Sequence, residues 1–263
     1  MNRKEAIKSF TGGLSVIIPT YNRESSIRLA IKSVIDDINE LGEWEIIVVD
    51  DCSSDKTVSM IQDMDVVIVQ MDKNQGANWA RNIGVERAKN EWIAFHDSDD
   101  VWLPGKFELF SAKFEGVDFL FTSLVQFDSN SAGLFPFKKN PDKLEDNFFK
   151  SRILRKNYVS TQTLFAKKSV LKSVGLFDTE MPRFQDWELA IRLFQSFEGR
   201  FIKNPGSIAY INGDSITKNY MNGIVGRKLI LKKHLQLYLK NPLAMFYFIL
   251  NLFLRYIFLP IKK

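Results

Sequence analysis

Four short apolar runs in the first hundred residues, separated by amphipathic stretches, constrain the fold of this chain more than any other feature. The runs cover residues 14–19, 45–50, 66–69 and 92–95 and are apolar at most positions. Continuous runs of this kind are typical of strands that are buried on both faces. Residues 25–38 and 77–88 repeat apolar side chains at helical spacing, and Ser53 or Ser54 can cap a further helix. The alternation predicts an α/β domain with a Rossmann-like, mostly parallel sheet and helices on both faces.

The pattern is less regular after Pro104. The elements expected there are strands at residues 116–126 and 159–166, a loop at 130–147 and a helix at 187–197. We expect one domain over residues 1–217, with halves at about 14–104 and 105–217, and a helical segment over 218–263.

Charge is divided unevenly along the chain. The net charge is +5, but residues 1–133 hold 13 basic and 22 acidic residues, whereas residues 134–263 hold 23 and 9. No acidic residue follows Asp214, although nine lysines and arginines do. A tail of one sign favours an anionic surface, either nucleic acid or the phospholipid headgroups of a cytoplasmic leaflet.

The same tail contains a long apolar run at residues 243–259. Within it, Tyr247, Asn251 and Arg255 recur every fourth residue and would form one narrow polar stripe on a helix. At about 1.5 Å per residue the run measures roughly 25 Å, slightly less than the ~30 Å hydrocarbon core of a bilayer. We therefore favour a helix in the membrane interface, with a helix packed on its own protein and a true span as the alternatives.

Two further features indicate the compartment. Cys52 is the only cysteine, which excludes an intrachain disulfide and is typical of a reducing environment. The N-terminal residues lack the apolar core of a signal peptide. Together with the tail, these features predict a cytoplasmic protein attached peripherally to the inner face of the cell membrane.

Polar segments follow each of the four predicted strands. They are Pro19-Thr20-Tyr21-Asn22-Arg23, the run Asp50 to Asp55, Asn74 to Asn78 with Arg81 beyond, and Asp97-Ser98-Asp99-Asp100. Because the carboxyl ends of parallel strands meet at one edge of a sheet, these segments converge on one crevice. There an aromatic ring can stack on a base, an arginine can pair with phosphate, and carboxylates can bind Mg²⁺ or Mn²⁺. Each segment alone is explained by a turn or a helix cap, but the four together indicate nucleotide chemistry.

These motifs in combination resemble the family 2 glycosyltransferases of the GT-A fold, over residues 14–217. The matching stretches are Val16-Ile17-Ile18-Pro19-Thr20-Tyr21-Asn22, Asp50-Asp51 with Ser53 and Asp55, Asn74 and Gly76 through Asn82, Asp97 to Asp100, and Gln185-Asp186-Trp187-Glu188-Leu189. The resemblance implies an inverting transfer of a sugar from a nucleotide sugar, usually UDP-linked, assisted by Mn²⁺ or Mg²⁺.

The resemblance also implies roles on the donor side. The residues expected to bind the nucleotide are Pro19, Thr20, Tyr21, Asn22, Arg23, Asp51, Arg81, Asp97 and Ser98. Among them, Thr20 and Tyr21 would hold uracil, and Asp51 would accept from its N3–H. Asp97 would bind ribose or the metal, and Asp99 would bind the metal.

On the acceptor side, a hydroxyl must lose its proton as it attacks the anomeric carbon, so a carboxylate is needed opposite the leaving diphosphate. Asp186 is our candidate for this base, and we expect Phe184, Trp187 and Glu188 at the acceptor site. Without the resemblance, Asp186 and Glu188 would simply complement the N-terminal dipole of a helix.

One departure from the family concerns the metal. Many relatives place a histidine that can help to hold the metal shortly before a Ser-x-Ser/Thr pair, whereas this chain has Asn212 there. An amide oxygen is a weaker ligand for a hard cation than a carboxylate. We do not expect His96 and His234 to form a metal pair, and we place His96 in the core or behind the site.

The motifs and the tail together predict a hexosyl- or N-acetylhexosaminyltransferase acting on a saccharide acceptor, lipid-linked and used for a bacterial surface polysaccharide. A catalytically inactive GT-A domain that binds a nucleotide sugar is the main alternative, followed by a nucleotidyltransferase. A dehydrogenase is excluded because no Gly-x-Gly-x-x-Gly follows the first strand. Nucleic acid is not an expected partner, because phosphate binding does not explain the apolar helix of the tail.

Overall fold

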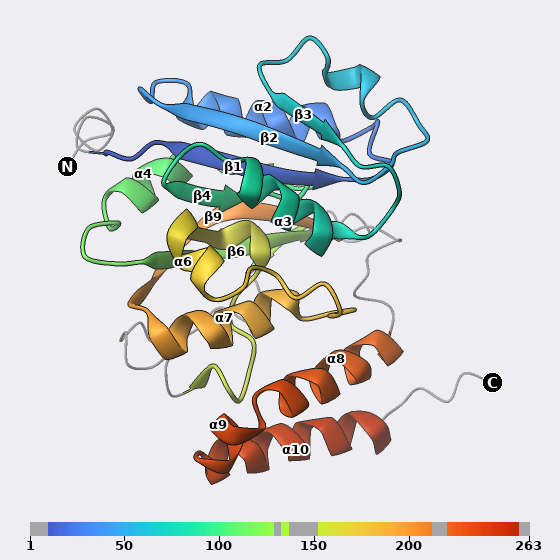
Figure 1. Cartoon of the computed structure of the whole chain (residues 1–263), viewed down its shortest axis with the longest axis vertical. Coiled ribbons are helices and arrows are strands. Elements are labelled where there is room, and N and C mark those ends of the chain that lie inside the picture. Colours follow the sequence, from blue (N-terminus) through green and yellow to red (C-terminus); the bar gives the residue numbers. More distant parts are fainter. Residues whose placement is uncertain (1–9, 129–132, 137–151, 212–219, 258–263) are drawn as a thin grey trace.

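The computed structural model describes residues 10–128, 133–136, 152–211 and 220–257 (Figure 1). Its centre is a sheet with the strand order β3-β2-β1-β4-β8-β6-β9-β5, to which β7 is added beside β6. The strands are β1 (Leu14–Thr20), β2 (Trp44–Asp50), β3 (Val67–Gln70), β4 (Trp92–Phe95), β5 (Val101–Trp102), β6 (Phe119–Asp128), β7 (Gly133–Pro136), β8 (Leu164–Lys167) and β9 (Gly199–Ile211). The predicted α/β class is therefore confirmed.

The two halves of the sheet differ in strand direction. Strands β3, β2, β1 and β4 are parallel, so their carboxyl ends lie at one edge, as expected. Strand β8 is antiparallel to both β4 and β6, whereas β6 and β9 are parallel with an irregular register at Thr122 and Ser123. The parallel half positions the polar segments that follow the first four strands.

Helices cover both faces of the sheet. They are α2 (Ile27–Ile38), α3 (Ala77–Arg87), α4 (Lys106–Ser111), α6 (Lys168–Ser173), α7 (Gln185–Ser196), α8 (Tyr220–Lys233), α9 (Leu235–Leu239) and α10 (Pro242–Ile257). Alternate residues of β1 point to opposite faces, so that Val16 and Ile18 join the core under α2 and α4, and Ile17 joins the core under α3. Gly84 allows the close approach of α3, because a Cβ there would lie 2.4 Å from Cγ2 of Ile17.

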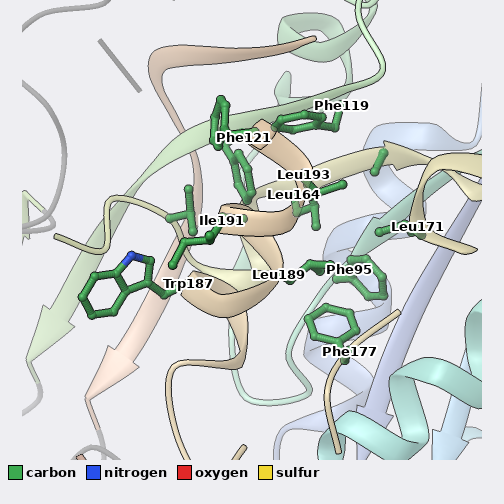
Figure 2. Packing of buried hydrophobic residues seen from close by; sticks show 14 of the residues in the cluster. Phe95, Phe119, Phe121, Leu164, Leu171, Phe177, Trp187, Leu189, Ile191 and Leu193 are labelled. Atoms are coloured by element: carbon green, nitrogen blue, oxygen red, sulfur yellow. The ribbon is translucent and has the colours of Figure 1, made fainter. Parts of the chain in front are cut away.

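The core under α3 continues between the sheet and α7. Figure 2 shows Leu189 and Leu193 of α7 in one cluster with Phe95 of β4 and with Phe119 and Phe121 of β6. Phe177, Phe194 and Phe201, from the second half of the chain, belong to the same cluster. Helices α8, α9 and α10 pack beyond α7, on its side away from the sheet (Figure 1).

Three expectations from the sequence differ from the structure. After Ser53 there is only a 3₁₀ turn, η1 (Ser59–Ile61), because the Ser53 hydroxyl bonds to Asp50 and to the loop after β1 instead of capping a helix. The expected strand at 159–166 begins with a 3₁₀ turn, η2 (Thr161–Thr163), and only then becomes β8. In the expected loop at 130–147, residues 133–136 form β7, and the remainder lies outside the described residues.

Among the residues that the structure describes, no helix combines the length and the apolar character needed to cross a membrane.

Candidate active site

The loops after β1 and β2 are tied to each other at the carboxyl edge of the sheet. The backbone amide of Asn22 donates to the Ser53 hydroxyl at 2.9 Å, and the backbone amide of Ser54 donates to Oδ1 of Asn22 at 2.9 Å. Asn22 has a φ of 50°, a left-handed conformation that asparagine tolerates better than most residues. These bonds hold the neighbouring ring of Tyr21 at the edge of the sheet, where it is 45% exposed.

Asp51 joins the end of β2 to the start of α3. Its carboxylate accepts hydrogen bonds from the backbone amides of Gln75 and Gly76, both at 2.7 Å. Gly76 has a φ of 94°, which a residue with a side chain rarely adopts. Because an ionised carboxylate offers about four acceptor positions, Asp51 can take a further donor from a ligand.

Arg81 and Asp97 form a largely buried ion pair below these loops. Nη2 of Arg81 lies 2.7 Å from Oδ1 of Asp97, and the arginine is only 4% exposed. Within the described part of the chain, Nε of Arg81 has no hydrogen-bond partner. The structure thus brings together two residues that the sequence assigned to donor binding.

The carboxylates of residues 97–100, the acidic turn, point in two directions. Asp99 is partly exposed and lies 3.3 Å from Nη2 of Arg23. Asp100 turns inward, where it accepts from Nε2 of Gln162 at 2.8 Å and from the backbone amide of Tyr210 at 3.2 Å. Burial and the nearby charge of Asp97 raise the pKa of Asp99, and burial with the charges of Asp97 and Asp99 raises that of Asp100 well above its usual value.

The exposed part of this turn fits a hard divalent cation. Asp97 and Asp99 supply carboxylate oxygens, and the crowding that raises the pKa of Asp99 would be relieved by a bound cation. Over the described ranges, the protein offers no group of three or more His, Cys, Asp or Glu side chains that could hold a metal. Phosphate oxygens and water would therefore complete the coordination, as is common for Mg²⁺. Asn212, the further ligand considered from the sequence, lies outside the described residues.

Asp186 lies in the first turn of α7 and is partly exposed. Its Oδ1 accepts from Nδ2 of Asn157 at 3.1 Å and from the backbone amide of Trp187 at 2.7 Å. Phe184, the residue before the helix, has a φ of 69°, so the chain turns sharply into α7. No pattern in the sequence pointed to Asn157, which is 29 residues away from the carboxylate that it holds.

Three residues expected around the acceptor are largely buried. Trp187 is 3% exposed, donates from Nε1 to the carbonyl of Ile153 and packs against Phe248 of α10. Glu188 is 2% exposed and bonds to Arg192 at 3.0 Å and to His234 at 3.2 Å. Phe184 is 8% exposed. The side chains of Trp187 and Glu188 link α7 to the C-terminal helices. Their place at the acceptor site stays a prediction.

The position of His96 in the core agrees with the expectation from the sequence. His96 is fully buried beside Trp102, and burial holds the pKa of its imidazole well below the usual value. His234 pairs with Glu188 of α7. It therefore belongs to the interface between α7 and the C-terminal helices.

Comparison with known proteins places the chain in a family. Residues 15–172 match the model of glycosyl transferase family 2. The chain belongs to this family. An uncharacterized glycosyltransferase of Haemophilus influenzae is 27% identical over 69% of this chain and 62% of its own length. The Escherichia coli UDP-Glc:alpha-D-GlcNAc-diphosphoundecaprenol beta-1,3-glucosyltransferase WfgD is 27% identical over 95% of this chain and 94% of its own length. The chain thus spans less than two thirds of the first relative.

Solved structures support the same fold. The S. aureus TarS fragment 1–349 in complex with UDP-GlcNAc aligns with a TM-score of 0.67 and 22% identity over 83% of this chain and 66% of that one. The mannosyltransferase PcManGT of Pyrobaculum calidifontis, in complex with GDP-Man and Mn²⁺, aligns with a TM-score of 0.64 and 16% identity over 87% of this chain and 65% of that one. The family 2 resemblance and the GT-A fold predicted from the sequence are confirmed.

Proposed function

We propose that this protein is an inverting glycosyltransferase that moves a hexose or N-acetylhexosamine from a UDP-sugar to a hydroxyl of a lipid-linked saccharide in bacterial surface polysaccharide synthesis. The observation that carries the proposal is the meeting of Tyr21, Asp51, Arg81, Asp97 and Asp99 at one sheet edge in a family 2 chain. The names of two similar proteins support the substrates, since WfgD acts on UDP-Glc and a diphosphoundecaprenol acceptor and TarS binds UDP-GlcNAc.

The donor half of the reaction needs a site for the nucleobase and a site for the diphosphate. Tyr21 offers an exposed ring on which uracil can stack, and Asp51 offers acceptor positions for its N3–H. Arg81, which is paired with Asp97, would bind the phosphates through its guanidinium. Mn²⁺ or Mg²⁺, held by Asp99 and Asp97, would neutralise the charge of the diphosphate.

The acceptor half needs a base on the opposite side of the sugar. We assign it to Asp186, whose carboxylate is oriented by Asn157. As the acceptor oxygen bonds to the anomeric carbon, its proton passes to Asp186 and the bond from that carbon to the UDP oxygen breaks, its electron pair leaving with UDP. A single displacement of this kind inverts the anomeric configuration.

The C-terminal helices are our candidate for the membrane contact. The inner side of α10 is buried through Ala244 and Phe248, whereas Phe246 and Phe253 are 60% and 59% exposed. Further exposed apolar residues of α8, α9 and α10 are Met221, Val225, Leu235, Leu239, Leu243, Ile249, Leu250 and Leu254. Exposed lysines accompany them at positions 228, 232 and 240. Apolar area combined with basic charge fits a peripheral contact with an anionic leaflet.

A screen of UDP-sugars tests the proposal. The purified protein is incubated with each sugar nucleotide and Mn²⁺, and UDP release is followed with and without acceptor. We expect one donor to be slowly hydrolysed and hydrolysis to stop in Asp186→Asn. Tight binding of UDP without release from any donor would instead favour the inactive GT-A domain.

A further inference from the structure

Two arginines share one phenyl ring beside Asp186. The guanidinium carbon of Arg183 lies 5.0 Å from the centre of the Phe184 ring, and that of Arg227 in α8 lies 4.3 Å from it. Nη1 of Arg227 also donates to the carbonyl of Gly223 at 3.1 Å. The ring thus fixes two planar cations at the junction of α7 and α8, two residues before Asp186.

Two glycines of α8 make this arrangement possible. A Cβ on Gly226 would lie 2.5 Å from the carbonyl oxygen of Arg183, so only glycine allows the helix this close. A Cβ on Gly223 would lie 3.1 Å from Nη1 of Arg183 and 3.7 Å from Nη1 of Arg227. The two Nη1 atoms therefore approach the same point and lie within about 7 Å of each other. Two guanidinium groups at this separation can clamp one phosphate or diphosphate group.

Segment 152–157 links the proposed base to the C-terminal helices. Segment 152–157 supplies Asn157, which holds Asp186, and also Arg155, whose guanidinium carbon lies 5.3 Å from the ring of Tyr247 in α10. The carbonyl of Leu154 in the same segment accepts from the hydroxyl of Tyr238 in α9 at 2.7 Å. The segment that holds Asp186 thus also contacts α9 and α10.

We propose that Arg183 and Arg227 bind the diphosphate of the acceptor, with its saccharide at Asp186 and its lipid at α10. This inference rests on the proposed function and narrows it to acceptors in which a short saccharide is carried on a lipid diphosphate. Guanidinium groups suit this ligand because their planar N–H donors form paired bonds to phosphate oxygens. A neutral glycolipid or a free polysaccharide offers no group for this pair.

The test compares two acceptors with the same saccharide, one on a short prenyl diphosphate and one on an uncharged alkyl chain of equal length. Arg183→Gln and Arg227→Gln should each raise KM for the diphosphate acceptor about tenfold or more, because each removes a charge-assisted hydrogen bond. KM for the uncharged acceptor and the affinity for UDP should stay unchanged. Arg183→Lys, which keeps the charge but not the paired donors, should give an intermediate KM.

Arg87→Gln is the matched control, since Arg87 is exposed in the last turn of α3, away from the α7–α8 junction. Equal losses with both acceptors, weakened UDP binding, or no preference of the parent for the diphosphate acceptor would overturn the inference. Calorimetry with the prenyl diphosphate saccharide distinguishes a failure of this inference from a failure of the proposed function. Binding that depends on Arg183 without sugar transfer would contradict the function alone, and binding unaffected by either arginine would contradict the inference.

Discussion

The carboxylates of the acidic turn, although adjacent in sequence, face different partners. Asp97 and Asp99 lie beside Arg81 and Arg23, whereas Asp100 is held by Gln162 and by the backbone of Tyr210. The first two are partly exposed, and the third fixes the turn to η2 and β9. Sequence spacing alone could not assign these directions, because both partners of Asp100 are distant in the chain.

Asp99→Asn should abolish the enhancement of UDP binding by Mn²⁺. The substitution removes a charged oxygen ligand without changing the size of the side chain, so a cation can no longer offset repulsion between the protein and the diphosphate. Titration calorimetry with UDP, with and without Mn²⁺, measures the effect, and Asp63→Asn, at an exposed ion pair with Arg28 of α2, is the control. An undiminished enhancement in Asp99→Asn would remove the metal role from this residue.

Asn157→Ala should lower kcat about tenfold while leaving UDP affinity unchanged, because the lost hydrogen bond orients the base and does not touch the donor. Steady-state kinetics at saturating donor, with UDP calorimetry on the same sample, distinguish this from a general defect. If kcat is unchanged, Asn157 does not position Asp186.

At the scale of elements, Glu188 links α7 to the C-terminal helices through its contact with His234. Burial opposes ionisation of this carboxyl, but hydrogen bonds from His234 and Arg192 and the charge of Arg192 outweigh it, so its pKa is lowered. A lowered pKa in the folded state means that the stabilisation is complete above the ordinary value of 4.5 and is lost as the pH falls through the folded value.

Glu188→Gln should therefore lower the free energy of unfolding at neutral pH by about 3 kcal/mol, since it removes the charge that pairs with the guanidinium of Arg192. The difference from the parent should shrink as the pH falls below 4.5. Denaturant unfolding at neutral pH and below pH 4.5 measures this difference. As the control, Glu180→Gln, at an exposed ion pair with Lys233, should change stability by no more than about 0.5 kcal/mol. A pH-independent difference would contradict the linkage.

The elements that the sequence predicted well are those defined by local pattern. Strands β1 to β4 are continuous apolar runs, and each was expected within a residue or two of its observed bounds. Strand β9 was not expected, because Lys203, Asn204 and Pro205 interrupt its pattern and its pairing with β6 bridges some eighty residues. The contacts of Trp187 with Phe248 and of Glu188 with His234 were not expected for a related reason, because these partners follow far along the chain.

At the scale of the whole molecule, α10 has one side packed on the protein and one side exposed. Its inner side covers Trp187 and Tyr238, so removing residues 241–263 would expose core residues as well as any membrane contact. Substitution on the outer side separates the two effects.

Phe246→Glu should keep the stability of the parent within about 0.5 kcal/mol, because the side chain is 60% exposed. It should also reduce sedimentation with liposomes that contain acidic phospholipid, since a charge replaces an apolar contact. Glu40→Gln, an exposed change on the far side of the sheet, serves as the control. High salt should weaken binding of the parent only in part. A parent that stays in the supernatant beside anionic liposomes would contradict the membrane contact.

The configuration of the product tests the central claim most directly. The parent protein is incubated with a UDP-α-sugar and a saccharide on a lipid diphosphate, and the anomeric centre of the product is determined by NMR. We predict a β-linked product from the parent and none from Asp186→Asn, which should still bind UDP because a base acts on the acceptor in the transition state. An α-linked product, or turnover of Asp186→Asn within about tenfold of the parent, would contradict the account.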